Sequence, residues 1–283
     1  MQMKYEDICR VLTDAGVEEA PHEATLLLTH FCGVTQAELP LVRGRNFDDA
    51  ALRVAVGRRC AREPLQYILG TWYFCHEVYE VNAHTLIPRS DTELLVELAV
   101  RHLREGAHFA DFCTGSGCVA VSTLCARPDT TALAVDKFPE TLAVAERNAV
   151  RNGVAARVRF DCRDVLAVDG ALYDPQISGS FDAILANPPY IASSVVPTLS
   201  PEVRHEPQAA LDGGADGLCF YRAILAGASR LLRPGGQLLF EIGYDQRQAV
   251  LALGEARGYR GQCLRDLGGQ DRVVLFTRAD VKE

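Results

Sequence analysis

Short apolar runs alternate with longer amphipathic stretches from residue 108 onward. The apolar runs read as buried strands, because they are too short for helices and are bounded by turn residues. The stretches between them repeat their apolar positions at helical spacing. Repeated strand–helix–strand units predict a parallel sheet covered by helices on both faces. The expected strands are 108–112, 131–135, 158–161, 181–186 and 237–242, with helices at 118–126, 139–152, 217–232 and 246–257.

Two further strands, 263–267 and 273–277, end the pattern, and the Gly-Gly-Gln-Asp segment 268–271 between them has the composition of a hairpin turn. Ser90 followed by Glu93 has capping-box spacing, which predicts a helix from about Asp91 to Arg104. Its buried face is expected to consist of Leu94, Leu95, Leu98 and Leu103. Segment 193–216 is long, polar and rich in Pro and Gly. A loop of this length is expected to act as a lid or a substrate loop.

The first quarter of the chain has a different pattern, in which leucines and valines recur among charged residues and Gly or Pro interrupts them. This predicts four or five short helices in a small bundle. A β-hairpin is expected to follow. The predicted organisation is therefore a helical domain over 1–75, a hairpin linker over 76–88, and a larger α/β domain over 89–283.

A glycine-rich turn follows the first strand of the α/β domain, in the segment Asp111-Phe112-Cys113-Thr114-Gly115-Ser116-Gly117. Gly115 and Gly117 let the backbone turn tightly and approach a ligand closely. The helix that begins near Gly117 offers free N–H groups and a partial positive charge.

Two carboxylates extend this candidate site. Asp136 ends the next strand about 20 residues after Gly117, which is the spacing of a carboxylate that binds ribose hydroxyls. Asp164 and Val165 follow the third strand and are expected to line an adenine pocket. The pattern predicts an adenosine-bearing ligand, although a dinucleotide fingerprint has the same features.

Asn187-Pro188-Pro189-Tyr190 follows the strand 181–186. Two prolines cannot continue a sheet ladder, and a residue before proline is held in an extended conformation. The result is a stiff strand end that presents an Asn side chain, backbone carbonyls and an aromatic ring. Such a group is suited to bind a planar amide or amine, because the carbonyls can accept hydrogen bonds from its N–H groups.

Composition narrows the functional classes. The 283 residues carry a net charge of −8, which disfavours a broad nucleic-acid surface. No apolar run reaches membrane-spanning length, so a cytoplasmic protein without membrane contact is expected. The ten cysteines are scattered without a Cys-x-x-Cys pair, so neither a zinc site nor a disulfide framework is expected.

An adenosine-binding turn together with Asn-Pro-Pro-Tyr indicates an S-adenosylmethionine-dependent methyltransferase that acts on a planar nitrogen. The chain resembles the release factor glutamine methyltransferases, the HemK-like family. The resemblance covers most of the sequence. It is carried by segments 63–70, 86–93, 111–118, 187–190, 201–207, 210–222 and 271–274. Cys113 departs from the family, since many relatives have a glycine there.

This resemblance implies a Rossmann-like α/β methyltransferase sheet with an N-terminal helical bundle. The bundle carries no identifiable chemistry, so we expect it to recognise the protein substrate; the alternative is a stabilising cap on the catalytic domain. The resemblance also implies S-adenosylmethionine as methyl donor, S-adenosylhomocysteine as product, and no metal. The implied substrate is a glutamine side chain of a class 1 peptide release factor, without direct nucleic-acid contact. Asn187 and Pro188 would be catalytic, and Asn187, Pro188, Pro189 and Tyr190 would bind the substrate. The cofactor would contact Asp111, Cys113, Thr114, Gly115, Ser116, Gly117, Asp136, Asp164, Val165 and Asn187.

Three alternatives stay open at this point. A ribosomal-protein glutamine methyltransferase shares the core motifs. An adenine-N6 nucleic-acid methyltransferase shares Asn-Pro-Pro-Tyr, but it would require a basic, aromatic-rich surface. A non-catalytic adenosine-binding module would have no use for Asn-Pro-Pro-Tyr at the strand end.

Overall fold

The computed structural model describes residues 3–167 and 178–278. The chain forms two compact units. Unit 1 contains the chain through Thr71 together with Ser200–His205, and unit 2 contains Trp72–Leu199 and the chain from Glu206 onward. A short segment of the predicted long loop therefore belongs to the N-terminal unit.

Unit 1 is the predicted helical bundle. Its helices are α1 (Tyr5–Asp14), α2 (Ala20–Cys32), α3 (Leu39–Val42), α4 (Ala50–Cys60) and α5 (Leu65–Leu69). Local signals explain two of the helix ends. The Asp49 side chain caps α4 by accepting a hydrogen bond of 2.8 Å from Leu52 N, and Gly33 ends α2 in the left-handed region at φ 66°. The fully buried core residues are Ile8, Leu12, Ala20, Ala24, Leu27, Leu28 and Leu52.

Charged pairs hold Ser200–His205 within unit 1. Glu202 accepts hydrogen bonds from Arg62 Nε at 2.6 Å and from Arg59 Nη1 at 3.1 Å. Burial raises the pKa of the Glu202 carboxyl, but the bonds from the two arginines outweigh it and the pKa falls to about 2. This carboxylate is therefore ionised at any physiological pH.

Unit 2 contains a small hairpin and a seven-stranded sheet. The hairpin strands are β1 (Thr71–Phe74) and β2 (Glu77–Glu80). The sheet has the order β5-β4-β3-β6-β7-β9-β8. Strands β5, β4, β3, β6 and β7 are parallel, while β9 is antiparallel to both β7 and β8. The strands are β3 (His108–Phe112), β4 (Thr131–Asp136), β5 (Val158–Cys162), β6 (Phe181–Ala186), β7 (Leu232–Glu241), β8 (Tyr259–Arg265) and β9 (Asp271–Arg278).

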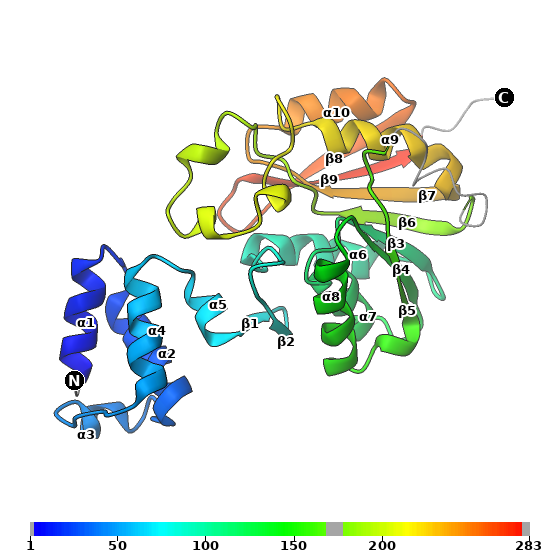
Figure 1. Ribbon diagram of the computed structural model, residues 1–283. Helices are drawn as coiled ribbons and strands as arrows, with labels where there is room; N and C mark the ends of the chain where they lie inside the picture. Colours follow the sequence, from blue (N-terminus) through cyan, green and yellow to red (C-terminus); the bar gives the residue numbers. More distant parts are fainter. Residues whose placement is uncertain (1–2, 168–177, 279–283) are drawn as a thin grey trace. The chain divides into compact units, whose positions relative to one another are not determined.

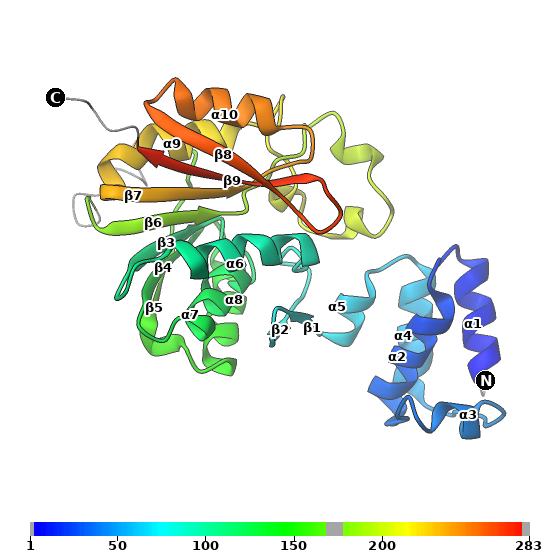
Figure 2. The same ribbon diagram turned by 180° about the vertical axis from the view of Figure 1, so that it is seen from behind.

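Helices cover both faces of this sheet, so the predicted α/β class is confirmed. Figures 1 and 2 show α6, α7 and α8 on one face and α9 and α10 on the other. The helices are α6 (Glu93–His102), α7 (Cys118–Ala126), α8 (Pro139–Arg151), α9 (Cys219–Leu231) and α10 (Arg247–Glu255). Short 3-10 turns are η1 (Ser90–Thr92), η2 (Ala155–Arg157), η3 (Val196–Thr198), η4 (Val203–His205) and η5 (Gln208–Ala210).

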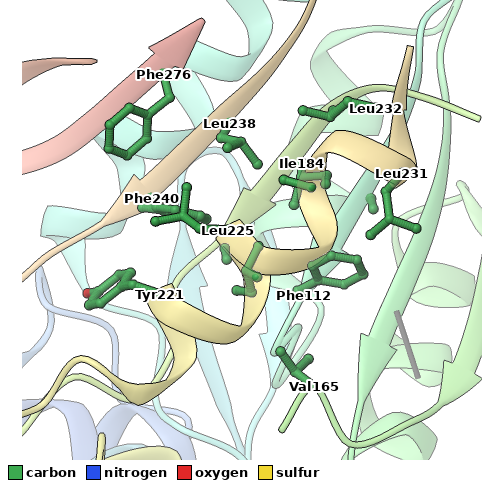
Figure 3. Packing of buried hydrophobic residues seen from close by; sticks show 14 of the residues in the cluster. Phe112, Val165, Ile184, Tyr221, Leu225, Leu231, Leu232, Leu238, Phe240 and Phe276 are labelled. Atoms are coloured by element: carbon green, nitrogen blue, oxygen red, sulfur yellow. The ribbon is translucent and has the colours of Figure 1, made fainter. Parts of the chain in front are cut away.

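The core between α9 and the sheet fixes the strand ends that carry the candidate site. Figure 3 shows Tyr221 and Leu225 of α9 directed toward side chains of the strands, including Phe112, Ile184 and Phe240. All five of these residues are at most 2% exposed. The Tyr221 hydroxyl donates a hydrogen bond of 2.8 Å to the backbone oxygen of Glu241. The end of β7 is thereby tied to α9.

The sheet topology places the candidate residues at one edge. The chain runs from β3 outward to β4 and β5, and then crosses to β6 on the other side of β3. Phe112 is in register with both Val135 and Ala186. The carboxyl ends of β3, β4 and β6 therefore lie side by side, at the topological switch point where α/β proteins bind ligands.

Three expectations differ from the structure. The sheet is mixed, because the last hairpin adds antiparallel strands to it. The first hairpin begins at Thr71 rather than at residue 76. The capping box is absent, since η1 precedes α6 and the Glu93 carboxylate accepts its hydrogen bond from Cys75 N at 3.1 Å.

Candidate functional site

A cavity of about 640 Å³ opens at this sheet edge, and all its lining residues belong to unit 2. Its size is within the range of small-molecule sites. Ten of the predicted residues line it, and Gly117, Pro188 and Tyr190 do not. The ten are Asp111, Cys113, Thr114, Gly115, Ser116, Asp136, Asp164, Val165, Asn187 and Pro189.

Asp111 at the end of β3 holds the glycine-rich turn together. Its Oδ2 accepts hydrogen bonds from Thr114 Oγ1 at 2.6 Å and from Ala120 N at 3.2 Å. The side chain is 1% exposed. Burial raises the pKa of its carboxyl to about 7, although these two donors lower it. Asp111 thus connects the turn to the first residues of α7.

The turn has the left-handed conformations that the glycines predict, and one that they do not. Gly115 has φ 58° and Gly117 has φ 80°, whereas Cys113 adopts φ 60° with a side chain present. Gly117 does not line the cavity, and it is a glycine because of packing against α8. A Cβ there would approach the Ala145 Cβ to 3.1 Å, so this glycine allows α8 to pack closely against the turn.

Asp136 at the end of β4 is positioned by backbone donors. Its Oδ2 accepts from Gly115 N at 3.0 Å and its Oδ1 from Phe138 N at 3.2 Å. Burial raises the pKa of this carboxyl. Two carboxylate oxygens offer about four acceptor sites, so capacity for ribose hydroxyls remains. Asp164 is paired with Lys137 Nζ at 2.9 Å; burial raises its pKa, but Lys137 makes the net shift downward.

Asn187 enters the same cavity from the end of β6. Its Nδ2 donates a hydrogen bond of 3.1 Å to Thr92 Oγ1. Pro188 and Pro189 are buried, which leaves the Asn187 side chain as the polar group presented at this strand end. This geometry agrees with the stiff strand end that the two prolines predict.

Tyr190 is not among the residues that line the cavity. Its hydroxyl lies 3.5 Å from Glu241 Oε1, and burial raises the pKa of its phenol. Its backbone oxygen accepts a hydrogen bond of 2.9 Å from Gln246 Nε2. A Cβ at Gly217 would come within 2.3 Å of the same oxygen, so the loop packs tightly behind the motif. The Tyr190 ring packs against the core between α9 and the sheet.

Sequence reasoning missed several residues around the site. Glu206 is buried, accepts a hydrogen bond of 2.9 Å from Ile87 N, and is paired with Arg89, which lines the cavity. Thr92 also lines the cavity, and Glu241 lies behind it. In the sequence, segments 86–93 and 201–207 are marked by their resemblance only. No spacing rule predicts contacts between such distant segments.

The residues fit an adenosine-bearing cofactor such as S-adenosylmethionine. Ser116 lines the cavity with a buried hydroxyl that has no hydrogen-bonding partner in the part of the chain described. The Asp136 carboxylate keeps acceptor capacity beside it. Within residues 3–167 and 178–278, no group of three His, Cys, Asp or Glu side chains is arranged to hold a metal ion. Over the same residues, no helix has the length and apolar character needed to span a membrane.

Comparison with known proteins covers both units. Residues 5–70 match the PrmC N-terminal domain, and residues 90–214 match the methyltransferase small domain. The release factor glutamine methyltransferase of Geobacter sulfurreducens is 42% identical over 273 residues, 93% of this chain and 91% of that protein. That of Moorella thermoacetica is 42% identical over 284 residues, 96% of each. A methyltransferase structure from Pyrococcus furiosus, 19% identical, covers 71% of this chain and 89% of its own at a TM-score of 0.53, which supports the fold alone.

Proposed function

This chain belongs to the release factor glutamine methyltransferase family, and we propose that it methylates the side-chain amide nitrogen of a glutamine in a class 1 release factor. S-adenosylmethionine is the proposed methyl donor. One observation supports this most strongly. Asn187, suited to a planar amide, and Asp136, suited to a ribose, line the same cavity. A release-factor substrate also implies action in the cytoplasm.

The cofactor would be held by the turn after β3 and by the residues after β4 and β5. When bound, it supplies an electrophilic methyl group on a sulfonium sulfur. Asp136 would accept the ribose hydroxyls, and Val165 would contact the adenine. The backbone of the turn, from Cys113 to Ser116, would contact the remainder. Holding donor and acceptor in one cavity makes orientation the main contribution to the rate.

The substrate amide would be held by Asn187 and Pro188. A carboxamide nitrogen is a weak nucleophile because its lone pair is delocalised into the carbonyl. We propose that the Asn187 side-chain oxygen and the Pro188 backbone carbonyl accept hydrogen bonds from its two N–H groups. As the methyl group moves from the sulfonium sulfur to the nitrogen, the nitrogen would gain positive charge, and these oxygens would stabilise that charge more than they stabilise the ground state. S-adenosylhomocysteine would leave, and one N–H proton would pass to solvent.

A labelling experiment tests this function. The purified enzyme is incubated with methyl-labelled S-adenosylmethionine and a purified class 1 release factor, and the labelled residue is located by mass spectrometry. The expected result is label on one glutamine side chain. Label on a ribosomal protein or on nucleic acid, with none on the release factor, would contradict it.

We also propose that unit 1 binds the protein substrate. An apolar groove on this unit is lined by Phe31, Val54 and Ile68 among others, and Val54 is 62% exposed. Val54→Asp is expected to raise KM for the intact release factor but not for a short glutamine peptide. Leu41, which is 85% exposed outside the groove, provides the matched control as Leu41→Asp. Equal KM values for Val54→Asp and Leu41→Asp on the intact protein would assign the unit a stabilising role only.

A further inference from the structure

Arg89 lines the cavity and has no part in the proposed mechanism. It immediately precedes η1, and its side chain is 38% exposed. Three residues later, Thr92 Oγ1 accepts the hydrogen bond of 3.1 Å from Asn187 Nδ2. The backbone at Arg89 is therefore close to the end of β6, which lies across β3 from β4 and β5.

Glu206 holds the guanidinium of Arg89 in place. Its side chain is 1% exposed, and its Oε2 accepts a hydrogen bond of 2.9 Å from Ile87 N. Its Oε1 accepts from Arg89 Nη2. Both carboxylate oxygens are thus engaged. A guanidinium has five N–H donors, and within residues 3–167 and 178–278 the bond to Glu206 is the only hydrogen bond that Arg89 donates. Arg89 therefore keeps N–H groups for a ligand.

The proposed methyl donor carries a group that requires such donors. S-adenosylmethionine ends in an amino-acid part whose α-carboxylate is ionised at neutral pH. Within a cavity this carboxylate needs a cation or several N–H groups, because its desolvation otherwise opposes binding. A planar guanidinium matches the two oxygens of a carboxylate better than a lysine ammonium does.

Two other lysine or arginine side chains from the described part of the chain line the cavity, and both are on its adenosine side. Lys137 follows β4 and is paired with Asp164 at 2.9 Å. Arg163 follows β5 and is paired with Asp161 at 2.8 Å. With adenosine held at the ends of β4 and β5, the amino-acid part would extend toward the ends of β3 and β6. Arg89 provides the positive charge on that side.

We propose that Arg89 binds the α-carboxylate of the methyl donor, and that Glu206 is a positioning residue for Arg89. This role rests on S-adenosylmethionine as the proposed donor. It adds a charged partner for the amino-acid part, which the glycine-rich turn contacts through its backbone. The carboxylate takes no part in methyl transfer. Holding it would anchor the donor at a second end and limit the positions of its methyl group relative to Asn187.

Two ligands that differ only in this carboxylate test the proposal without any release factor. S-adenosylhomocysteine carries it, whereas the decarboxylated analogue keeps the adenosine, the thioether and the amine. In calorimetry, the wild-type enzyme should bind S-adenosylhomocysteine about 10- to 100-fold more tightly, as expected for hydrogen bonds between charged groups. Arg89→Gln should lose most of this difference, because it weakens the binding of S-adenosylhomocysteine alone.

A second variant avoids an unpaired buried charge. Arg89→Gln alone leaves the Glu206 carboxylate without its cation, which destabilises a buried pair. Arg89→Gln combined with Glu206→Gln replaces the pair with two neutral amides, and we expect the same loss of ligand discrimination. Arg89→Lys keeps the charge without the planar donors and should retain part of the discrimination. Lys137→Gln is the matched control, because it removes a positive charge from the adenosine side and should change both affinities by the same factor.

Equal affinities of the wild-type enzyme for the two ligands would overturn the carboxylate site, whether or not the variants fold. Wild-type discrimination in the double variant, or an equal loss of affinity for both ligands, would overturn the assignment to Arg89. A wild-type enzyme that discriminates as expected but labels no release factor would refute the proposed function and leave this site intact. An enzyme that binds neither ligand would refute both.

Discussion

The two strand ends that face the cavity are built in opposite ways. At the end of β3, Asp111 binds Thr114 and Ala120, its neighbours within nine positions of the chain. At the end of β6, the partner of Asn187 lies 95 residues away. Tyr190 of the same motif reaches a third segment, since its hydroxyl lies 3.5 Å from Glu241 Oε1 at the end of β7. The cofactor side is thus largely a local structure, whereas the substrate side forms only when distant parts of unit 2 have folded together.

Removing the Asn187 side chain has the largest expected effect and tests the substrate side of this comparison. Asn187→Ala should lower kcat by about 10²- to 10³-fold, by analogy with the loss of one positioned group at an oxyanion site. Cofactor affinity should stay close to wild type, because the turn after β3 does not depend on this residue. Rates at saturating cofactor and binding by calorimetry check both statements.

The complementary substitution, at Asp136, changes the cofactor side of the cavity. Asp136→Ala should weaken S-adenosylmethionine binding about 10- to 100-fold, since hydrogen bonds to a charged group contribute roughly 1.5–3 kcal/mol. Asp129, which precedes β4 at its opposite end and is paired with Arg127, serves as control in Asp129→Ala. If both variants bind the cofactor equally well, the ribose site is elsewhere.

The pH dependence of kcat sharpens the comparison further. Burial raises the pKa of the Glu241 carboxyl from 4.5 to about 7, and Asp91 of η1 adds to this rise. Thr92, Arg272 of β9 and the Tyr190 hydroxyl each lower the pKa. Protonated Glu241 is a weaker acceptor for the Tyr190 hydroxyl of the Asn-Pro-Pro-Tyr motif, which lies 3.5 Å from its Oε1. We therefore expect kcat to fall as pH drops below about 7, and Glu241→Gln to lack this acidic limb.

Stability should respond to pH with the opposite sign. A carboxyl whose pKa is higher in the folded than in the unfolded protein stabilises the fold fully below its unfolded value, and the contribution is lost as pH rises through about 7. Asp111 contributes to the pH dependence of stability in the same direction, because burial also raises the pKa of its carboxyl to about 7. Calorimetric unfolding from about pH 5.5 to about pH 8.5 should show lower stability at the alkaline end from these two groups.

The smallest expected effect concerns the strained residue of the turn. Cys113 adopts φ 60°, which costs a residue with a Cβ roughly 1 kcal/mol relative to glycine. Cys113→Gly and Cys113→Ala both remove the sulfur, but only the alanine keeps the Cβ. The glycine variant should be the more stable by about 1 kcal/mol. Equal denaturation midpoints would show that the turn relaxes around the Cβ.

The contrast between the two strand ends also explains what the sequence could predict. The glycine-rich turn, Asp136 and the strand ended by Pro188 are visible because local rules of conformation govern them. The strand–helix repetition predicts the α/β class, whereas the sheet order and the switch point are known only from the structure. The placement of Tyr190 on the substrate face stays a prediction, and its contact of 3.5 Å with Glu241 Oε1 is one that nothing in the four-residue motif predicts.

The capping box illustrates the same limit. Ser90 and Glu93 have the required spacing, yet Glu93 binds Cys75 of the hairpin and the N-cap residue is Thr92. A tertiary hydrogen bond displaced the local one. The contacts of Thr92, Glu206 and Glu241 depend in the same way on segments that only the folded chain brings together.

Single-turnover methyl transfer at rising cofactor concentration tests the division between the two strand ends most directly. Asp136→Ala and Asn187→Ala are compared on a saturating amount of release factor. The account predicts that cofactor excess restores the rate of Asp136→Ala and leaves Asn187→Ala slow at every concentration. Restoration of Asn187→Ala by cofactor, or a low plateau rate for Asp136→Ala, would contradict it.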